Sequence, residues 1–138
     1  MRNRRIIAAA LTLLLAACAA NTARDGPTAM QAPRSWPTAR PASPDALPEI
    51  LAVNFSSDTV STGDWWAGQI ATASNVASIE VRSPSFSISV PRVSVGQFAF
   101  RLHVIDLPTL YRRPYDVAVI ARNTAGIATA RHYRINFR

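Results

Sequence analysis

The amino-acid sequence predicts an all-β domain over residues 49–138, a sandwich of two sheets made from seven short strands. Hydrophobic residues in this region recur at every second position, which is the period of a strand. Polar or small residues fill the positions between them, as expected for sheets that bury one face. No segment after residue 49 has a convincing helical period. Two such sheets form a sandwich when their apolar faces pack together.

The first four strands follow from this alternation and from the turn residues beside it. Apolar residues alternate from Leu51 to Phe55, and the next run begins just after the turn signal Thr62-Gly63-Asp64. The fourth run ends at Pro91, because proline cannot donate to a strand ladder. The seven strands are expected at residues 51–55, 66–71, 77–82, 86–90, 98–104, 115–122 and 133–137.

The last three strands carry charged or polar residues on their outward phase. Arg101 and His103 alternate with apolar residues in the first of them, and Asp116 and Arg122 do so in the second. In the third, His132, Arg134 and Asn136 alternate with aromatic and aliphatic residues. The inward phase of all three strands is therefore expected to complete the core.

A secretory signal precedes this domain. Three arginines open the chain, an apolar run from Ile6 to Leu15 follows, and small residues lead to the single cysteine, Cys18. The apolar run is shorter than the roughly 20 residues of a membrane-spanning helix. With one cysteine in the chain, no internal disulfide can form.

The run Leu15-Ala16-Ala17-Cys18 resembles the lipobox of bacterial lipoproteins. The resemblance implies that residues 1–17 are a removed signal peptide and that Cys18 carries lipid, on its sulfur and on the new amino terminus. Several acyl chains on one residue give stable membrane anchoring. Ala19 follows the cysteine, and the absence of aspartate there implies sorting to the outer membrane of a Gram-negative cell.

Residues 18–48 are expected to be a lipidated cysteine followed by a disordered, proline-rich tether. Proline fixes φ and removes backbone donors, and the few large apolar residues here offset little ordering entropy. Trp36 is the one exception, expected in solvent or weakly docked on the domain. The prolines of the tether are Pro27, Pro33, Pro37, Pro41, Pro44 and Pro48.

Two stretches of the domain resemble bacterial immunoglobulin-like domains. Residues 68–81, GQIATASNVASIEV, resemble their second and third strands, and residues 115–126, YDVAVIARNTAG, resemble their sixth strand and final hairpin. The second stretch also resembles fibronectin type III modules. The resemblance implies a seven-stranded immunoglobulin-like sandwich, with Tyr115 at the position of the corner tyrosine. The intersheet cysteine pair of antibody domains and the acidic calcium loop of some relatives are both missing.

Catalytic and metal-binding patterns are missing from the sequence. His103, His132 and Asp106 suggest a hydrolase triad, but no nucleophile elbow accompanies them, which favours two surface histidines. No closely spaced Cys or His ligands suit zinc, and the eight acids are dispersed. We therefore interpret the domain as non-enzymatic and expect no cofactor, no metal and no nucleic-acid partner.

All 15 basic residues are arginine, and 12 of them follow the signal peptide, against eight acids. Arginine forks suit phosphate and carboxylate groups, so lipopolysaccharide phosphates or acidic glycans are conceivable partners. The arginines are scattered rather than clustered, which favours a solvated charged surface.

Four residues are the candidates for a binding site. Trp65 and Trp66 are adjacent, so on a strand one fills the core while the other is exposed or covered by a loop. The longest irregular stretch, residues 106–114, carries Tyr111, Arg112 and Arg113, and loops on a rigid sandwich commonly carry recognition. We select Trp65, Tyr111, Arg112 and Arg113.

The function expected from these features is a lipid-anchored envelope protein with a structural, adhesive or protein-binding module. Its partner would be another envelope protein or a cell-wall or surface polymer, with strand pairing at a sheet edge as one natural mode. The alternative is an accessory lipoprotein whose arginines hold lipopolysaccharide phosphates or acidic glycans.

Overall fold

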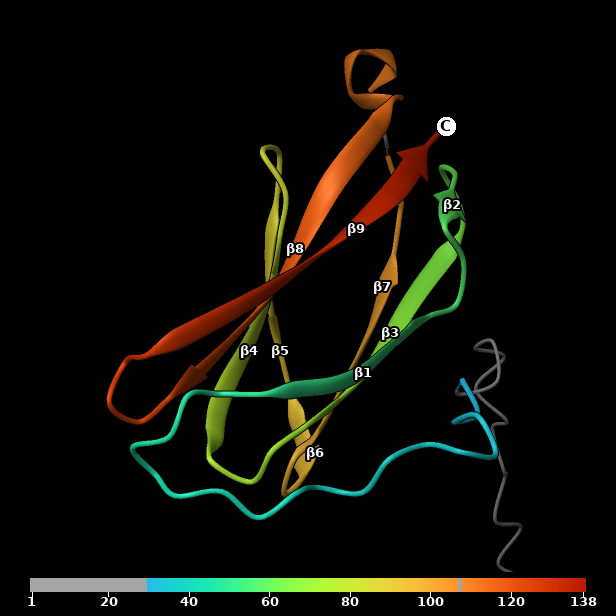
Figure 1. Ribbon diagram of the computed structural model, residues 1–138. Helices are drawn as coiled ribbons and strands as arrows, with labels where there is room; N and C mark the ends of the chain where they lie inside the picture. Colours follow the sequence, from blue (N-terminus) through green and yellow to red (C-terminus); the bar gives the residue numbers. More distant parts are fainter. Residues whose placement is uncertain (1–29, 107) are drawn as a thin grey trace, which may run out of the picture.

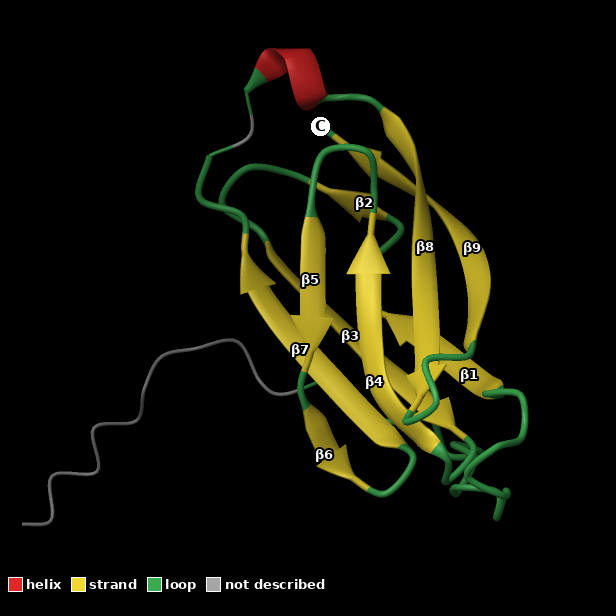
Figure 2. Ribbon diagram, turned by 90° about the vertical axis from the view of Figure 1, so that its left-hand side faces the viewer, coloured by secondary structure: helices red, strands yellow, loops and turns green. Residues whose placement is uncertain are grey.

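The computed structural model describes residues 30–138 except Leu107, and within that part it confirms the all-β prediction. Two sheets pack face to face as a sandwich (Figures 1 and 2). The predicted signal peptide, Cys18 and the first part of the predicted tether lie outside the described residues. The strands are β1 (Ile50–Phe55), β2 (Thr59–Val60), β3 (Trp65–Thr72), β4 (Val76–Arg82), β5 (Ser87–Val90), β6 (Arg92–Ser94), β7 (Gln97–His103), β8 (Pro114–Asn123) and β9 (Ala128–Phe137).

All seven predicted strands are present, and the structure adds two short ones, β2 and β6. The four-stranded sheet has the order β1-β3-β7-β6, and the five-stranded sheet has the order β2-β9-β8-β4-β5. Neighbouring strands are antiparallel except for β2 and β9, which are parallel. A 3₁₀ turn, η1 (Thr109–Tyr111), lies in the long irregular stretch before β8.

An aromatic cluster centred on Trp66 joins the two sheets. Its indole lies 5.2 Å from the Phe55 ring and 5.1 Å from the Phe100 ring in its own sheet. Across the sandwich it meets Phe137 of β9 at 6.0 Å and Phe86, just before β5, at 6.2 Å. Such offset and edge-on pairs add to the area that each ring buries. Trp66 therefore packs against aromatic rings from both sheets at the centre of the core.

Gly68 has a packing role in this core. It lies opposite Phe100 in the β3–β7 pair, and a Cβ at this position would stand 2.3 Å from the Phe100 ring. Glycine inside a strand commonly marks such a close approach. The phenylalanine ring thus covers the glycine and fills the space that a side chain would take.

The predicted tether differs from the structure over its described part. Residues 30–48, here called the strap, lie against the sandwich and cross beneath it before entering β1 (Figure 1). Trp36 Nε1 donates to Gln97 Oε1 at 2.7 Å, and Gln97 Nε2 donates to the Pro37 carbonyl at 3.0 Å. The strap also forms an isolated parallel bridge between Arg40 and Ala73.

The reason for this docking is that the sandwich supplies the donors that a proline-rich segment can use. Proline leaves carbonyl acceptors but removes N–H groups. Asn75 Nδ2 donates to the Ala46 carbonyl at 2.7 Å, and Asn123 Nδ2 lies 3.1 Å from the carbonyls of Pro44 and Ala46. These side chains are far away in the sequence, so the composition of the strap alone gives no sign of them.

Replacing Gln97 with alanine is expected to loosen the strap. The change removes the hydrogen bonds to Trp36 and to the Pro37 carbonyl, which together contribute roughly 1–2 kcal/mol. Limited trypsin digestion should cut after Arg34 several-fold faster than in the unmodified protein. Ser94→Ala, a change at an exposed position of neighbouring β6, should leave the rate unchanged. Equal rates for both variants would contradict the role given to Gln97.

Candidate binding surface at the loop end

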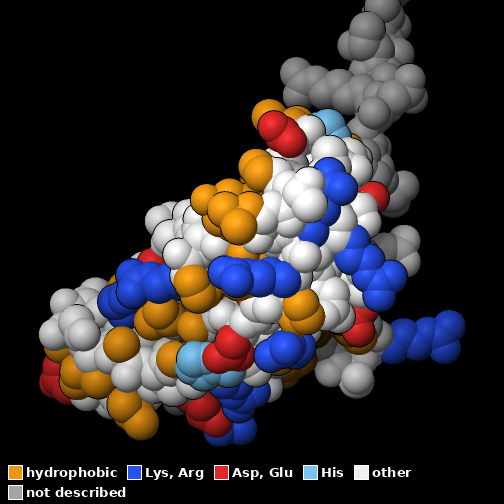
Figure 3. All heavy atoms as spheres, turned by 90° about the horizontal axis from the view of Figure 1, so that it is seen from above, with side chains coloured by type: hydrophobic (Ala, Val, Ile, Leu, Met, Phe, Trp, Pro, Cys, Tyr) orange, Lys and Arg blue, Asp and Glu red, His pale blue; other side chains and the backbone are white. Residues whose placement is uncertain are grey.

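One end of the sandwich gathers exposed apolar side chains, and we call it the loop end. It contains the start of β3, the end of β7, the stretch between β7 and β8, and the C-terminus (upper part of Figure 1). Figure 3 looks onto this end and shows apolar side chains interspersed with arginines. Its exposed large apolar residues are Trp65, Leu102, Ile105, Leu110 and Tyr111.

Trp65 forms a fixed platform on the outer face of the four-stranded sheet. Because side chains alternate along a strand, burial of Trp66 places Trp65 outside, where 44% of its surface is exposed. The indole stacks on the His103 ring at 4.7 Å, and the Arg101 guanidinium lies 4.6 Å from its centroid. Cation–π contact and stacking together restrict the ring without burying it.

Two aliphatic side chains in the stretch between β7 and β8 are largely exposed to solvent. Leu110 lies in η1 and is 74% exposed, and Ile105 is 76% exposed. Hydrogen bonds between Gly63 and Val104 and between Val104 and Asp64 fix the start of this stretch to the β2–β3 connection. Loops held by a rigid scaffold in this way are common recognition elements.

A cavity of about 300 Å³ lies beside this stretch. Asp106 and Tyr111 line it from the loop, and Phe86, Tyr115 and Phe137 line it from the core. Tyr111 is 40% exposed, so it contacts both the cavity and solvent. The arrangement can receive an apolar side chain next to a carboxylate.

The exposed side chain of Arg113 contacts Tyr115. Its Nε donates to the Tyr115 hydroxyl at 3.2 Å, and its guanidinium lies 5.2 Å from the same ring. A hydrogen bond with the Ser85 side chain and this contact with Arg113 lower the pKa of Tyr115 below its usual value. Tyr115 is buried, and its hydroxyl reaches the side chains of residues 85 and 113. Arg113 therefore positions the start of β8.

The structure places all four sequence-predicted residues at the loop end, on two sides of it. Trp65 stands on the outer face of the four-stranded sheet, whereas Tyr111 lines the cavity beside the five-stranded sheet. Arg112 is exposed, and its backbone N–H donates to the Thr109 carbonyl at 3.1 Å. Trp65 and Tyr111 are the two candidates whose rings are available to a partner.

Sequence reasoning missed two residues of this surface, Arg101 and His103. Their contact with Trp65 follows from the register, which sets His103 directly opposite Trp65 and Arg101 opposite Ala67. The outward phase of all three residues was visible in the sequence. The pairing of β3 with β7 was not, so the stack could not be derived.

The two histidines are both exposed, as the sequence predicted, and they lie on different sheets. His132 of β9 contacts Asp116 at 2.8 Å, while the His103 Nε2 atom lies 3.2 Å from the Gly63 carbonyl. In the described part of the chain, no three His, Cys, Asp or Glu side chains come together as a metal site. Over the same residues, no helix is long and apolar enough to cross a membrane.

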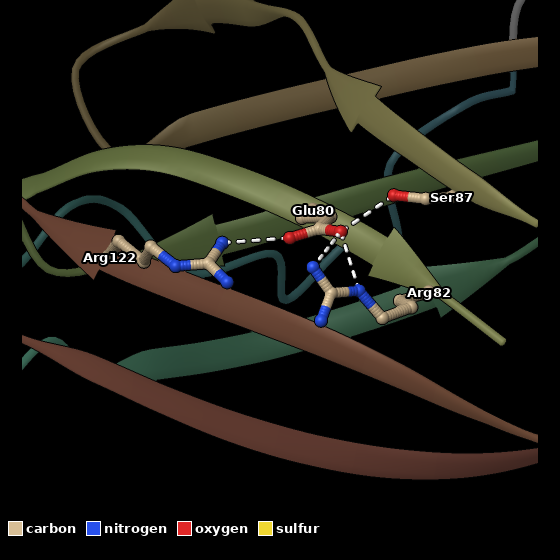
Figure 4. Close-up of polar contacts among 4 residues, drawn as sticks. All are labelled: Glu80, Arg82, Ser87 and Arg122. Carbon is tan, nitrogen blue, oxygen red and sulfur yellow. Dashed lines mark hydrogen bonds and ion pairs between the residues drawn. The ribbon is translucent and has the colours of Figure 1, made fainter. Parts of the chain in front are cut away.

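A charge cluster on the outer face of the five-stranded sheet is centred on Glu80 (Figure 4). Its Oε1 accepts from Ser87 Oγ at 2.6 Å and from Arg82 Nε at 2.7 Å, and its Oε2 accepts from Arg122 at 2.8 Å. These bonds lower the pKa of Glu80 to about 2, with the Ser87 and Arg122 bonds contributing most. The cluster joins β4, β5 and β8 and is a structural element.

Replacing Glu80 with glutamine is expected to destabilise the domain by about 1 kcal/mol near neutral pH. Because the folded-state pKa lies below the ordinary value of 4.5, the contribution is full above that value and is lost as the pH falls towards 2. Urea unfolding at about pH 6 and about pH 3 should show the difference from the unmodified protein shrinking at the lower pH. Asp116→Asn, at an exposed ion pair, is the control with little effect at about pH 6.

Comparison with known proteins gives likenesses to solved structures. No protein-family model matches the sequence, and no curated protein matches it. A solved structure similar to this chain is a DUF4785 family protein from Legionella pneumophila, with a TM-score of 0.48 and 13% sequence identity. The match covers 62% of this chain and 27% of that protein, so the chain spans about a quarter of its length.

Proposed function

We propose that this chain is a lipid-anchored envelope protein whose immunoglobulin-like sandwich binds a partner protein through the loop end. The observation that carries the proposal is the group of five exposed large apolar side chains gathered at one end of the fold. Exposed apolar surface gathered in one region of a soluble protein commonly marks an interaction site. The lipobox resemblance at Cys18 supplies the anchor.

The composition of the loop end suits a protein surface. Aromatic residues and arginine are enriched at the centres of protein interfaces, where they contribute most of the binding energy. Trp65 is held by Arg101 and His103, so little side-chain entropy is lost when a partner covers it. Asp64 and Asp106 also lie at this end, which favours a partner of mixed charge over a phosphate-rich polymer.

The contact of Met30, the first described residue, with the sandwich favours a short distance between the sandwich and the membrane. Met30 lies on the outer face of the four-stranded sheet, where its carbonyl accepts from Gln69 Nε2 at 2.6 Å. The twelve residues that follow Cys18, up to and including Met30, can span at most about 40 Å. Because the strap is docked, the module is held nearer the membrane than a free tether of residues 18–48 would allow.

The anion-binding alternative has less support from the arginine contacts. Arg82 and Arg122 bind Glu80, and Arg40 binds Glu49. Arg92 donates to the backbone carbonyl of Val76. Since these guanidinium groups already have acceptors within the protein, a phosphate would have to compete with them.

Affinity purification of the anchored protein from envelopes tests the proposal. Leu110→Asp, at the 74% exposed tip of η1, should lower recovery of the partner at least about tenfold. Leu47→Asp, at a 66% exposed position of the strap, is the matched control and should have no effect. Equal recovery with both variants would overturn the role of the loop end. Recovery of phosphate-rich or acidic glycan alone, lost at high salt, would favour the anion-binding alternative.

A further inference from the structure

Among the four sheet edges in the part of the chain that the structure describes, β5 is the least protected against pairing. Strand β2 has two residues and is parallel to β9, while β1 and β6 each contain a register shift. Strand β5 pairs with β4 in regular register along its whole length. No charged residue and no proline lies between Ser85 and Val90. Short length, irregularity, charge and proline are the usual protections of an edge, and β5 has only its short length.

Within the described residues, the backbone groups of β5 that do not face β4 belong to Ser87 and Ser89. The Ser83 N–H donates to the Phe86 carbonyl at 2.8 Å, which makes this the hydrogen-bonded pair at the hairpin. Hydrogen-bonded and non-hydrogen-bonded pairs alternate along an antiparallel ladder. Ile88 therefore bonds to Val81 of β4, and the backbone groups of Ser87 and Ser89 point away from the sheet. Both serines are exposed.

These outward groups are self-complementary across a two-fold axis. If β5 of a second copy lies antiparallel with its Ile88 opposite Ile88, each Ser87 faces Ser89 of the other copy. Both such pairs are then hydrogen-bonded pairs of the antiparallel ladder, and the arrangement is isologous. The Ser87 hydroxyl already donates to Glu80 Oε1, so in this pairing it can accept from the Ser89 hydroxyl of the other copy.

A second feature on the same side of the sandwich supports a contact here. The chain passes directly from β5 through Pro91 into β6, and Val93 of β6 is 70% exposed. An exposed valine beside an unprotected edge adds apolar area to the same surface. We propose that β5 and the adjacent β6 form a symmetric interface with a second copy of this chain.

In this pairing the start of the strap lies on the same side of both copies. This point rests on the lipid anchor of the proposed function. A two-fold axis normal to the five-stranded sheet leaves both four-stranded sheets on the same side of the joined sheet. Met30 lies on the outer face of the four-stranded sheet in each copy. Met30 of both copies therefore faces the same side, which is compatible with anchoring in one membrane, where anchoring raises the effective concentration.

Disulfide crosslinking of the anchored protein in native envelopes tests the pairing. The variant Ile88→Cys places a thiol on the proposed axis, at a non-hydrogen-bonded pair with Cα atoms about 4.5 Å apart, within the range of a disulfide. Mild oxidation should convert it to a covalent dimer. Ser78→Cys, at an exposed position of β4 away from the edge, should stay monomeric.

Two further variants in the Ile88→Cys background test the backbone mechanism. Ser89→Pro removes an outward N–H and should reduce the dimer at least about tenfold, whereas Ser89→Ala keeps the N–H and the dimer. Two outcomes would overturn the proposal whatever the proline variant does. One is an equal dimer yield from Ile88→Cys and Ser78→Cys, and the other is crosslinking of Ile88→Cys only to other proteins. A disulfide dimer of the protein without an added cysteine would reveal a free Cys18 and contradict the lipid anchor instead.

Discussion

Replacing Trp66 with alanine is expected to destabilise the domain by about 3–5 kcal/mol, because it empties the centre of the core. The indole is almost fully buried and contacts rings from both sheets. In a domain of this size the change should lower Tm by more than about 10 °C. Urea and thermal unfolding, monitored by circular dichroism, give both values.

The neighbouring residue is the control for this prediction. Trp65→Ala removes a side chain of the same size from the outer face, where its partners are His103 and Arg101. Its effect on the free energy of unfolding should stay below about 1 kcal/mol, while binding at the loop end falls. Similar destabilisation by both variants would contradict the assignment of the two tryptophans to opposite faces.

Replacing Cys18 with serine is expected to abolish lipid attachment completely. The lipobox resemblance implies that the thiol receives the lipid before residues 1–17 are removed. The variant should therefore lack the acyl mass, keep residues 1–17 and fail to incorporate labelled palmitate. Intact mass spectrometry of the purified protein measures all three changes.

Ala19→Ser is the control for this variant, since it changes the next residue without touching the thiol. It should keep the acyl mass and the cut before Cys18. A Cys18 thiol that reacts with maleimide in the unmodified protein would show that no lipid is attached, and the anchoring proposal would then be wrong.

The strand pattern was predictable because a half-buried strand leaves a period of two in the sequence. Every predicted strand is found, since each carries at least three alternating apolar residues. Strands β2 and β6 have two and three residues, too few to show a period. Strand β9 begins at Ala128, earlier than the predicted residue 133, because Thr129 and Arg131, which share the inward phase of Tyr133, are polar.

The strap and the Trp65 stack depend on contacts between residues that are distant in the sequence. The strap is fixed by Asn75, Gln97 and Asn123, whose side chains reach its carbonyls from three separate strands or turns. The stack depends on the register of β3 against β7. Neither the contacts of the strap nor the β3–β7 register leaves a local signal in the sequence. The composition of the strap therefore predicted a disordered tether, although distant side chains of the sandwich donate hydrogen bonds to it.

Site-specific photocrosslinking in intact envelopes can show which protein contacts the loop end. A photoreactive residue replaces Leu110 at the loop end in one sample and Leu47 of the strap in the other, both in the anchored protein. Our account predicts one reproducible protein neighbour from position 110, none from position 47, and loss of that neighbour with Cys18→Ser. The same neighbours from both positions, or no protein neighbour from position 110, would contradict it.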